Sequence, residues 1–513
     1  MVLLRLNLPL LVAITSLCTL GAVSGRTLSA SAPAPSPYIP RFIAAPCPFI
    51  PAVDQAEGTT VSCGFVAVPE NRVRPNGRWI KLAVAIFKAP EIPTQPPLIF
   101  LGGGPGSFVL EGFGPRVSGT LARDLTAGRD FVMFDQRGVG FSEPALDCHE
   151  LRDLRDRAIQ THPTRDQEID DRVEAAFACR DRLVGSGIEL AAYNTEASAA
   201  DVNDIRRALG YGQLDVWGLS YGTRLALVVE RNFPEAVHSL VLDSALPPPV
   251  NQLVDRAANA ERAFRVLFDG CAADLACASA YPNLETVFYD LVARLNLTPA
   301  RYLAQHPVTG KVYNVVLTGD RLVATLVDAL VPPFLIPSVP LVAMSIHHGD
   351  FTLMSQATSL LWFDDSHSAG MFYSVNCADN ASRTSQQQVS AARTNVRPEI
   401  AAALREDARL RICAGWGAAQ PGPGAATPVA SDVPTLILAG QYDPLTPPRY
   451  ATIAGRTLRN SDWFQFPAMG HNLQRSSPCA HQMIMEFLAN PALTPDASCI
   501  AEMQPPMWVI PPN

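Results

Sequence analysis

The feature that most constrains the fold is the G-x-S-x-G pattern of residues 218–222, because of where it stands in the chain. Residues 214–217 (LDVW) before it predict a short strand, and residues 223–230 after it predict a helix. Glycines on both sides let a strand and a helix pack closely around a sharp turn. The middle residue, Ser220, then stands at a helix N-terminus, where the helix dipole favours negative charge. The segment therefore predicts a strand–turn–helix unit.

Other short apolar runs share the character of this strand. They lack the alternation of half-exposed strands and are typical of strands buried on both faces of a parallel sheet. Because such strands alternate with helices, we expect right-handed crossovers. The runs are residues 97–101, 131–134, 238–242, 434–438 and 463–466.

Two local elements complete this part of the prediction. A β-hairpin is predicted from residues 61–68 and 79–87, because a turn signal, RPNG, lies between them. A helix is predicted from Asp201 to Leu209, with Asp201 and Asp204 near its start, where anions are favoured.

The pattern changes between residues 247 and 430, which are mostly helical and interrupted by prolines. Short apolar runs that predict buried strands occur again after this stretch. We therefore predict one α/β domain with a mostly parallel central sheet flanked by helices, formed by residues 45–246 and 431–513. Residues 247–430 are predicted to be a helical insertion, the natural candidate for a lid over the functional site. A chain of 513 residues can bury a core of this size.

The N-terminus has the features of an export signal. Arg5 is followed by an apolar run over residues 8–20 and by small residues at 22–24. This order of basic, apolar and small residues predicts a signal peptide at residues 1–24 and a secreted or periplasmic protein. A membrane anchor is the alternative, but a spanning helix needs roughly 20 apolar residues.

Two further features belong to this region. Cys18 could indicate a lipoprotein, but Leu17 stands before it where a small residue is required. Residues 25–44 are rich in Ser, Ala and Pro and are predicted to be a flexible leader.

Cysteine usage agrees with export. Eleven cysteines are present, and removal of Cys18 with the signal leaves an even ten, which suggests disulfides in an exported chain. A metal site is disfavoured, because no C-x-x-C occurs and the histidines lack zinc-site spacing; His347 and His348 are expected on the surface. We hypothesise that neighbouring cysteines pair: Cys47 with Cys63, Cys148 with Cys179, Cys271 with Cys277, Cys377 with Cys413, and Cys479 with Cys499.

A serine in such a turn needs a base, and the base needs an acid that fixes its tautomer. Proteins with this serine turn carry serine, acid and histidine in that order along the chain. His471 directly follows the last predicted strand, whereas His481 lies in the following helix and is the weaker candidate. Asp443 follows a strand 28 residues before His471; Asp243, at the end of the preceding strand, is its rival. The predicted catalytic set is Ser220, Asp443 and His471.

A glycine-rich loop, residues 102–106 (GGGPG), follows an early strand. Backbone amides without side chains can approach a tetrahedral oxyanion closely. The amides of Gly103 and Tyr221 are therefore the predicted oxyanion donors. A phosphate-binding loop is the alternative, but the Lys and Ser/Thr of a P-loop are missing.

Taken together, the motifs resemble the prolyl aminopeptidase and tripeptidyl aminopeptidase family of α/β-hydrolases, over residues from about 45 to 500. The signal peptide and paired cysteines are similar to those of the secreted tripeptidyl branch. The resemblance implies an α/β-hydrolase fold and hydrolysis of peptide bonds near a free N-terminus. It rests on residues 103–106 (GGPG), 135–140 (DQRGVG), 218–222 (GLSYG), 442–444 (YDP) and 470–471 (GH).

The resemblance also implies that acidic residues from the lid bind the substrate amine. Asp379 is the candidate in this chain, with Ala378 beside it where the family would have a second acid. A solvated loop position is the alternative for Asp379. Arg137, in the DQRGVG motif, is expected to organise its loop electrostatically.

The predicted reaction is acyl transfer, which requires no metal or organic cofactor. Peptides are the first expected substrates, and small esters or amides are the alternative with the same catalytic residues. An inactive binding protein on the same scaffold is disfavoured by the intact catalytic set. The net charge of −8 argues against a general affinity for nucleic acids.

Overall fold

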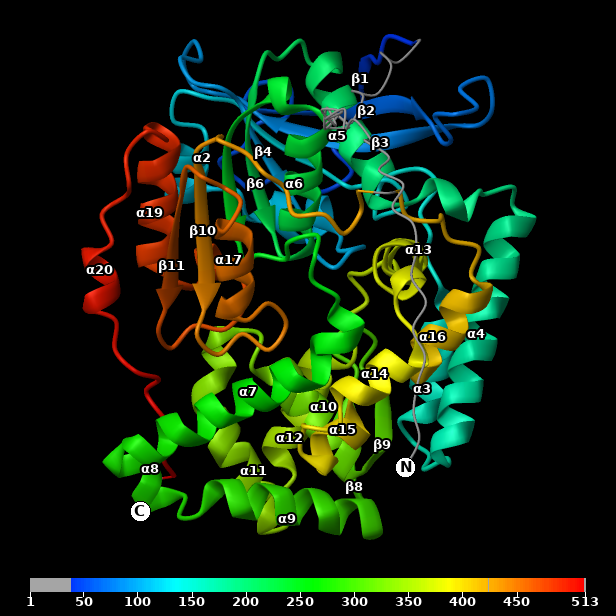
Figure 1. Cartoon of the computed structure of the whole chain (residues 1–513), viewed down its shortest axis with the longest axis vertical. Coiled ribbons are helices and arrows are strands. Elements are labelled where there is room, and N and C mark those ends of the chain that lie inside the picture. The colour runs from blue at the N-terminus through cyan, green and yellow to red at the C-terminus, as the bar shows by residue number, and fades with distance from the viewer. Residues whose placement is uncertain (1–37, 423, 512–513) are drawn as a thin grey trace, which may run out of the picture. The chain divides into compact units, whose positions relative to one another are not determined.

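The computed structural model describes residues 38–422 and 424–511. These residues include a nine-stranded sheet, in the upper half of Figure 1. The first three strands in the sheet order pair antiparallel, up to the β3–β5 pair, and all later neighbours are parallel. This agrees with the predicted α/β fold class. The order is β1 (Phe42–Ala44), β2 (Val61–Pro69), β3 (Trp79–Phe87), β5 (Phe131–Phe134), β4 (Leu98–Leu101), β6 (Leu214–Leu219), β7 (Val237–Asp243), β10 (Thr435–Gly440) and β11 (Ser461–Phe466).

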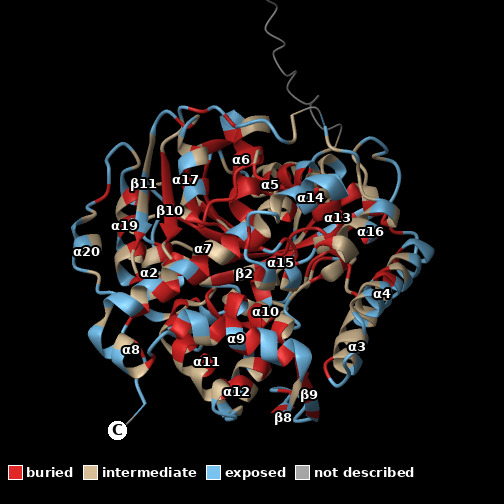
Figure 2. Ribbon diagram, turned by 60° about the horizontal axis from the view of Figure 1, so that its bottom comes forward, coloured by how far each residue is buried: buried red, intermediate tan, exposed pale blue. Residues whose placement is uncertain are grey.

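The apolar runs of the sequence form the interior strands. Every residue of β4, β5 and β10 is buried, as expected for strands covered on both faces. The predicted hairpin is β2 and β3, with Val61 opposite Phe87. Figure 2 shows the buried residues gathered around these strands.

Successive residues of the strands enter two separate cores, one on each face of the sheet. Val216 packs with α5 (Thr195–Ala208), α6 (Tyr221–Asn232) and α17 (Pro448–Gly455). Its neighbour Trp217 packs on the opposite face. The helices there are α1 (Val109–Phe113), α2 (Gly119–Leu125) and α19 (Pro478–Ala489).

One predicted helix begins at a different place. α5 starts at Thr195 rather than at Asp201, so Asp201 and Asp204 lie inside the helix and not near its start. Both carboxylates are buried, and Arg72 pairs with both of them at 2.5 and 2.8 Å. Their charge is therefore balanced by arginine and not by the helix dipole.

The stretch predicted as a lid, residues 247–430, is mostly helical but also contains an antiparallel pair, β8 (Ala300–Gln305) and β9 (Val312–Leu317). Much of it shares one hydrophobic core of its own. The helices are α7 (Gln252–Ala273), α8 (Leu275–Ala280), α9 (Leu284–Leu297), α10 (Gly319–Ala329), α11 (Val339–His347), α12 (Thr352–Leu361), α13 (Ala369–Asp379), α14 (Gln386–Ala392), α15 (Pro398–Ala403) and α16 (Asp407–Gly415).

A second group of helices contacts the stretch predicted as a lid. α3 (His149–Ala158) and α4 (Arg165–Gly185) follow β5; α3 packs against α4, and α4 packs against α16 (Figure 1). The amide of Val316 in β9 donates to the carbonyl of Ile159 at 2.8 Å. None of the ten residues of α3 is buried, whereas α4 buries Val173, Ala176, Cys179 and Leu183 in a core that it shares with Ile412 and Trp416.

The N-terminal predictions are only partly covered by the structure. The predicted signal peptide, residues 1–24, and residues 25–37 of the predicted leader lie outside the described residues. The rest of the predicted leader includes β1, which pairs with β2 through Phe42 and Val66. Among the described residues, no helix combines the length and apolar character needed to cross a membrane.

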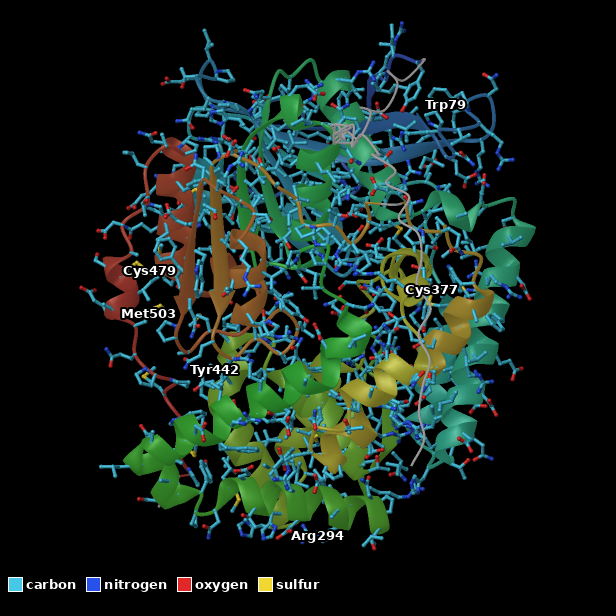
Figure 3. The ribbon with its side chains drawn as sticks, viewed as in Figure 1. Trp79, Arg294, Cys377, Tyr442, Cys479 and Met503 are labelled. Carbon is cyan, nitrogen blue, oxygen red and sulfur yellow. A yellow bond between two sulfur atoms is a disulfide. The ribbon has the colours of Figure 1, made fainter. Side chains whose placement is uncertain are left out.

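The five disulfides have the hypothesised pairing. Closure of short loops by several disulfides is typical of exported proteins, and Figure 3 labels Cys377 and Cys479, one member of each of two bonds. The bonds are Cys47–Cys63, Cys148–Cys179, Cys271–Cys277, Cys377–Cys413 and Cys479–Cys499.

Candidate active site

Ser220 occupies the turn between β6 and α6 with a φ of 58° and a ψ of −122°. A positive φ is uncommon for a residue with a side chain and is concentrated at functional sites. The turn depends on its glycines: a Cβ on Gly218 would collide with the backbone of Gly222, and one on Gly222 with the carbonyl of Leu101. The G-x-S-x-G pattern thus has a steric reason in this structure.

The register of the parallel strands brings the three predicted catalytic loops to one edge of the sheet. Leu219 lies opposite Asp243, which in turn lies opposite Leu438. Gly440, at the end of β10, lies opposite Phe466, at the end of β11. The residues that follow β6, β10 and β11 therefore leave the sheet at the same edge.

His471 and Asp443 form a direct pair at this edge. Nδ1 of His471 lies 2.7 Å from Oδ2 of Asp443, and both residues are buried. Although burial opposes both charges, the mutual attraction and hydrogen bond lower the pKa of Asp443 and raise the pKa of His471. The pair can therefore hold the imidazole in the tautomer with Nδ1 protonated and stabilise the imidazolium.

Thr446 is a part of this pair that sequence reasoning missed. Its hydroxyl donates to Oδ2 of Asp443 at 2.6 Å and lies 3.1 Å from Nδ1 of His471. The amides of Leu445 and Thr446 donate to the other carboxylate oxygen at 2.7 and 2.9 Å. The sequence did contain a signal for Thr446, because this hydroxyl residue follows Asp443 within the same loop, D-P-L-T-P.

The glycine-rich loop lies against the serine. A Cβ placed on Gly103 would stand 2.9 Å from Cβ of Ser220 and 3.5 Å from its Oγ. Only a glycine therefore allows the backbone to approach the serine this closely. Gln136 holds the loop from behind, because its Nε2 donates to the carbonyl of Gly102 at 3.0 Å. Tyr221, the other predicted donor, is the first residue of α6.

The first residue of the DQRGVG motif fastens the same loop. Oδ1 of the buried Asp135 accepts from the amides of Val109 and Leu110 at 2.8 and 3.0 Å, and Oδ2 accepts from Phe141 at 2.9 Å. Burial raises the pKa of Asp135 to about 6. Asp135 thus ties the segment after the glycine-rich loop to the end of β5.

Arg137 has the organising contacts that its position in the motif predicted. It is fully buried, and its Nε and Nη2 donate to Asp201 at 2.7 Å each. Its Nη1 donates to the carbonyls of Glu70 and Ala192 at 2.9 and 2.7 Å. These contacts join the loop after β5 to α5 and to the backbone at Glu70 and Ala192.

Asp379 is the last residue of α13, and its side chain is only 14% exposed. Its Oδ2 accepts from the hydroxyl of Thr195 at 2.8 Å and lies 3.6 Å from Nη1 of Arg224. Thr195 also contacts the hydroxyl of Tyr221 at 2.8 Å. Burial raises the pKa of Asp379, against the opposing effect of Arg224. Asp379 therefore belongs to a polar network behind the serine turn and is not a solvated loop residue.

The stretch predicted as a lid is hydrogen-bonded to the loops of both His471 and Asp443. Arg262 of α7 donates to the carbonyl of Asp443 and to that of Gln441, at 2.7 Å each. The amide of His471 donates to the carbonyl of Val331, just after α10, at 2.8 Å. The stretch predicted as a lid thus contacts the backbone of two predicted catalytic residues.

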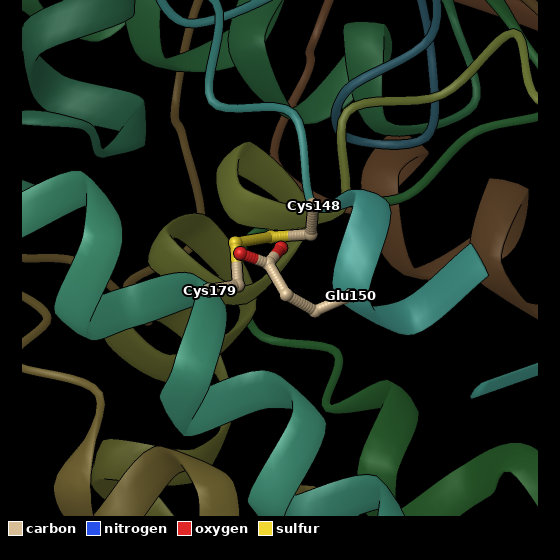
Figure 4. Close-up of side chains that lie close together, drawn as sticks. All are labelled: Cys148, Glu150 and Cys179. Atoms are coloured by element: carbon tan, nitrogen blue, oxygen red, sulfur yellow. A yellow bond between two sulfur atoms is a disulfide. The ribbon is translucent and has the colours of Figure 1, made fainter. Parts of the chain in front are cut away.

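One cluster in the described residues has the composition of a metal site, Cys148, Glu150 and Cys179 (Figure 4). Its two sulfur atoms are bonded to each other and are not thiolate ligands. The carboxylate of Glu150 pairs with Nε of Arg182 at 2.6 Å. The cluster is therefore a disulfide beside a surface ion pair.

Comparison with known proteins gives two matching family models, one described as the alpha/beta hydrolase fold (residues 96–335) and one as a TAP-like protein (residues 399–499). Serine protease Hip1 of Mycobacterium tuberculosis (strain ATCC 25618 / H37Rv) is 28% identical over 78% of this chain and 79% of its own length. Tripeptidyl aminopeptidase of Streptomyces lividans is 35% identical over 37% of this chain and 36% of its own length. Carboxylesterase B of M. tuberculosis (strain CDC 1551) is 27% identical over 44% of each chain.

The sheet, the serine turn and these matches define the protein as an α/β-hydrolase and a serine hydrolase. Within that class, the second family model, described as a TAP-like protein, covers the segment with Asp443 and His471, so this part of the chain is TAP-like. The predicted fold class and the predicted family resemblance are both confirmed.

Proposed function

We propose that this protein is an exported serine peptidase that cleaves peptide bonds near a free N-terminus. Ser220 is the nucleophile, His471 the general base and Asp443 the orienting acid. The observation that carries the proposal is the 2.7 Å contact of His471 with Asp443, at the sheet edge where Ser220 occupies its strained turn. Peptide substrates are supported by the serine protease and the tripeptidyl aminopeptidase among the relatives.

The proposed reaction follows from the donors and acceptors at this edge. Because Nδ1 of His471 donates to Asp443, Nε2 is free of a proton and removes the one on Ser220 Oγ. Oγ attacks the scissile carbonyl, and the amides of Gly103 and Tyr221 hold the oxyanion. His471 then gives its proton to the leaving amine, and a water molecule activated by His471 hydrolyses the acyl-enzyme.

We propose Asp379 as the group that binds the substrate amine. Its contacts with Thr195 and Arg224 both use Oδ2. Oδ1 is the atom that we assign to the amine. Thr195 connects Asp379 to Tyr221, the residue after the nucleophile, which supports a position close to the scissile bond.

The proposed organisation of the chain is a signal peptide at 1–24, a leader at 25–44, and a hydrolase core at 45–246 and 431–513. Residues 247–430 form the proposed lid. Export is supported by the five disulfides and by the basic, apolar and small residues at the N-terminus.

The first test is active-site labelling. A fluorophosphonate should label the wild type, and Ser220→Ala should abolish both labelling and hydrolysis of peptide anilides. His471→Ala should slow labelling strongly, whereas His481→Ala should not, because His481 contacts Asp124 at 2.9 Å and not Asp443. Equal labelling of wild type and Ser220→Ala would refute the proposal.

An esterase or amidase for small substrates is the second candidate, because carboxylesterase B is among the relatives. Tripeptidyl and aminoacyl anilides, their N-acetylated forms and short-chain esters separate the two. A peptidase of the proposed type should lose activity when the amine is acetylated. Asp379→Asn should then raise KM for free-amine peptides and leave KM for esters unchanged. Activity confined to esters would favour the second candidate.

A further inference from the structure

Asp243 is a buried acid that the proposed reaction does not use. It ends β7, the strand between β6 and β10, and its exposure is 0%. Its main-chain carbonyl accepts a hydrogen bond from the amide of Ser220 at 2.9 Å. The backbone of Asp243 thus holds the serine turn at its strained residue.

The side chain of Asp243 holds the segment that directly follows His471. Oδ1 accepts from the amide of Leu473 and Oδ2 from the amide of Gln474, at 3.1 Å each. The hydroxyl of Ser244 donates to Oδ1 of Asp243 at 3.0 Å, and its oxygen accepts from the amide of Asn472 at 3.1 Å. Three successive amides after His471 are therefore bound by two successive residues of β7 and its exit.

The backbone at this contact is in conformations that require support. Asn472 has a φ of 65° and Ser244 a φ of 62°. Residues with side chains keep such angles only where the surroundings hold them there. The hydrogen bonds of Asp243 and Ser244 supply this restraint on both sides of the contact.

We propose, resting on the function proposed above, that Asp243 is a positioning residue that couples the nucleophile to the base. One residue binds the amide of Ser220 through its backbone and the loop of His471 through its carboxylate. Asp243 is not the orienting acid, because the backbone amides occupy its oxygens and Asp443 contacts Nδ1 of His471. Asp243 ends β7, which lies between the strand that leads to Ser220 and the strands that precede Asp443 and His471. Its position therefore fixes the separation of Ser220 and His471.

The test replaces one carboxylate oxygen by an NH2 group. In Asp243→Asn the NH2 cannot accept from a backbone amide, so the loop of His471 shifts. We expect kcat on a peptide anilide to fall by about 10- to 100-fold, with KM within about threefold of wild type, because small displacements of a catalytic group have effects of this size. Asp130→Asn is the matched control: Asp130 is buried and accepts from the amide of Ala89 at 3.0 Å, but it precedes β5 at the opposite edge of the sheet. It should leave kcat within about twofold of wild type.

Fluorophosphonate labelling separates positioning from a general loss of folded protein. A positioning role predicts a slower labelling rate with the same final labelled fraction as wild type. An unchanged rate with a smaller labelled fraction would mean only that fewer molecules are folded, and would overturn the proposal.

Ser244→Ala provides the second variant, because it removes one acceptor and leaves the carboxylate in place. Its kcat and labelling rate should fall by about three- to tenfold. If Asp243→Asn does not fold, the result for Ser244→Ala decides. Wild-type rates in Ser244→Ala, or in Asp243→Asn, would overturn the positioning role alone. Labelling of Ser220→Ala would overturn the proposed function and this inference with it.

Discussion

Two residues of the site are held in states that cost free energy. Ser220 has a positive φ, and Asp443 is a carboxylate with no exposed surface. Strained backbone of this kind costs on the order of 1–3 kcal/mol per residue. The carboxylate is compensated by contacts to both oxygens, from Thr446, Leu445 and His471. These contacts explain how a buried charge persists beside the histidine.

The titration of His471 should determine the acid limb of the pH–rate profile. Burial opposes its charge, but Asp443 raises the pKa of His471 above the ordinary value of 6.5. Because the base must be neutral, kcat/KM should be lost as the pH falls through this raised pKa. Asp443→Asn removes the attraction, so the remaining activity should have its acid limb at lower pH.

The measurement is kcat/KM for a chromogenic substrate from about pH 5 to about pH 9, the range in which a catalytic histidine titrates. Thr446→Val is a second variant for this measurement, because it keeps the charges of Asp443 and His471 and removes one hydrogen bond to Asp443. A wild-type inflection below 6.5 would contradict the assignment of the limb to His471.

At the scale of elements, parallel strands place the site and glycines allow its loops to meet. The turn after β6 and the loop after β4 approach each other at Ser220 and Gly103. Asp135 and Gln136, after β5, fasten the second of these loops. The motifs of the sequence are thus the contact points between neighbouring strand ends.

Gly103→Ala should separate these loops. The added Cβ would lie 2.9 Å from Cβ of Ser220, so the loop must move and its amide is displaced. We expect kcat to fall about 100-fold, the size of effect seen when an oxyanion donor is lost. Gly112→Ala is the control, because a Cβ there meets nothing within 4 Å. Equal activities of the two variants would contradict the proposed oxyanion role.

At the scale of the whole molecule, several contacts join the proposed lid to the core. Arg262 and Val331 bind the loops of Asp443 and His471, and the segment after α20 (Ser498–Ala501) also reaches the proposed lid. In that segment Trp508 is buried in the lid core with Tyr442, which Figure 3 labels. The amide of the neighbouring Val509 donates to the carbonyl of Pro337 at 3.1 Å.

Trp508→Ala should therefore destabilise the protein strongly. Loss of a buried tryptophan costs about 3–5 kcal/mol in the free energy of unfolding. Trp463→Ala is the comparison, since Trp463 is 43% exposed and should cost less than half as much. Denaturant unfolding followed by circular dichroism measures both. Equal losses would show that the C-terminal segment does not hold the lid.

The disulfides should differ in their contribution to stability. Cys377–Cys413 closes a separation of 36 residues, whereas Cys271–Cys277 closes only 6. Loop-closure entropy predicts that removal of the first pair costs more, by about 1.6 kcal/mol. Thermal unfolding of the two double Cys→Ser variants, under oxidising conditions, tests the order. The reverse order would show that native packing dominates over chain entropy.

Several features could be predicted from the sequence because they depend on local chemistry. Short apolar runs such as residues 131–134 specify buried strands, and neighbouring cysteines close the shortest loops. The glycines around Ser220 reflect a steric need of the turn itself. The start of α5 was predicted wrongly, because Asp201 and Asp204 resemble acids of a first turn but are paired with Arg72.

What only the tertiary structure decided is which groups meet across distant parts of the chain. Asp443 was predicted as the acid with Asp243 as its rival, because both stand where a buried strand ends at the same edge of the sheet. In the fold, Asp443 contacts the imidazole of His471, whereas Asp243 accepts hydrogen bonds from the backbone amides that follow His471. The hydrogen bond from Val316 in β9 to Ile159, just after α3, is likewise a contact that no local pattern encodes. Such pairings depend on loop paths and packing between elements, whereas strands, turns and local disulfides depend on neighbours along the chain.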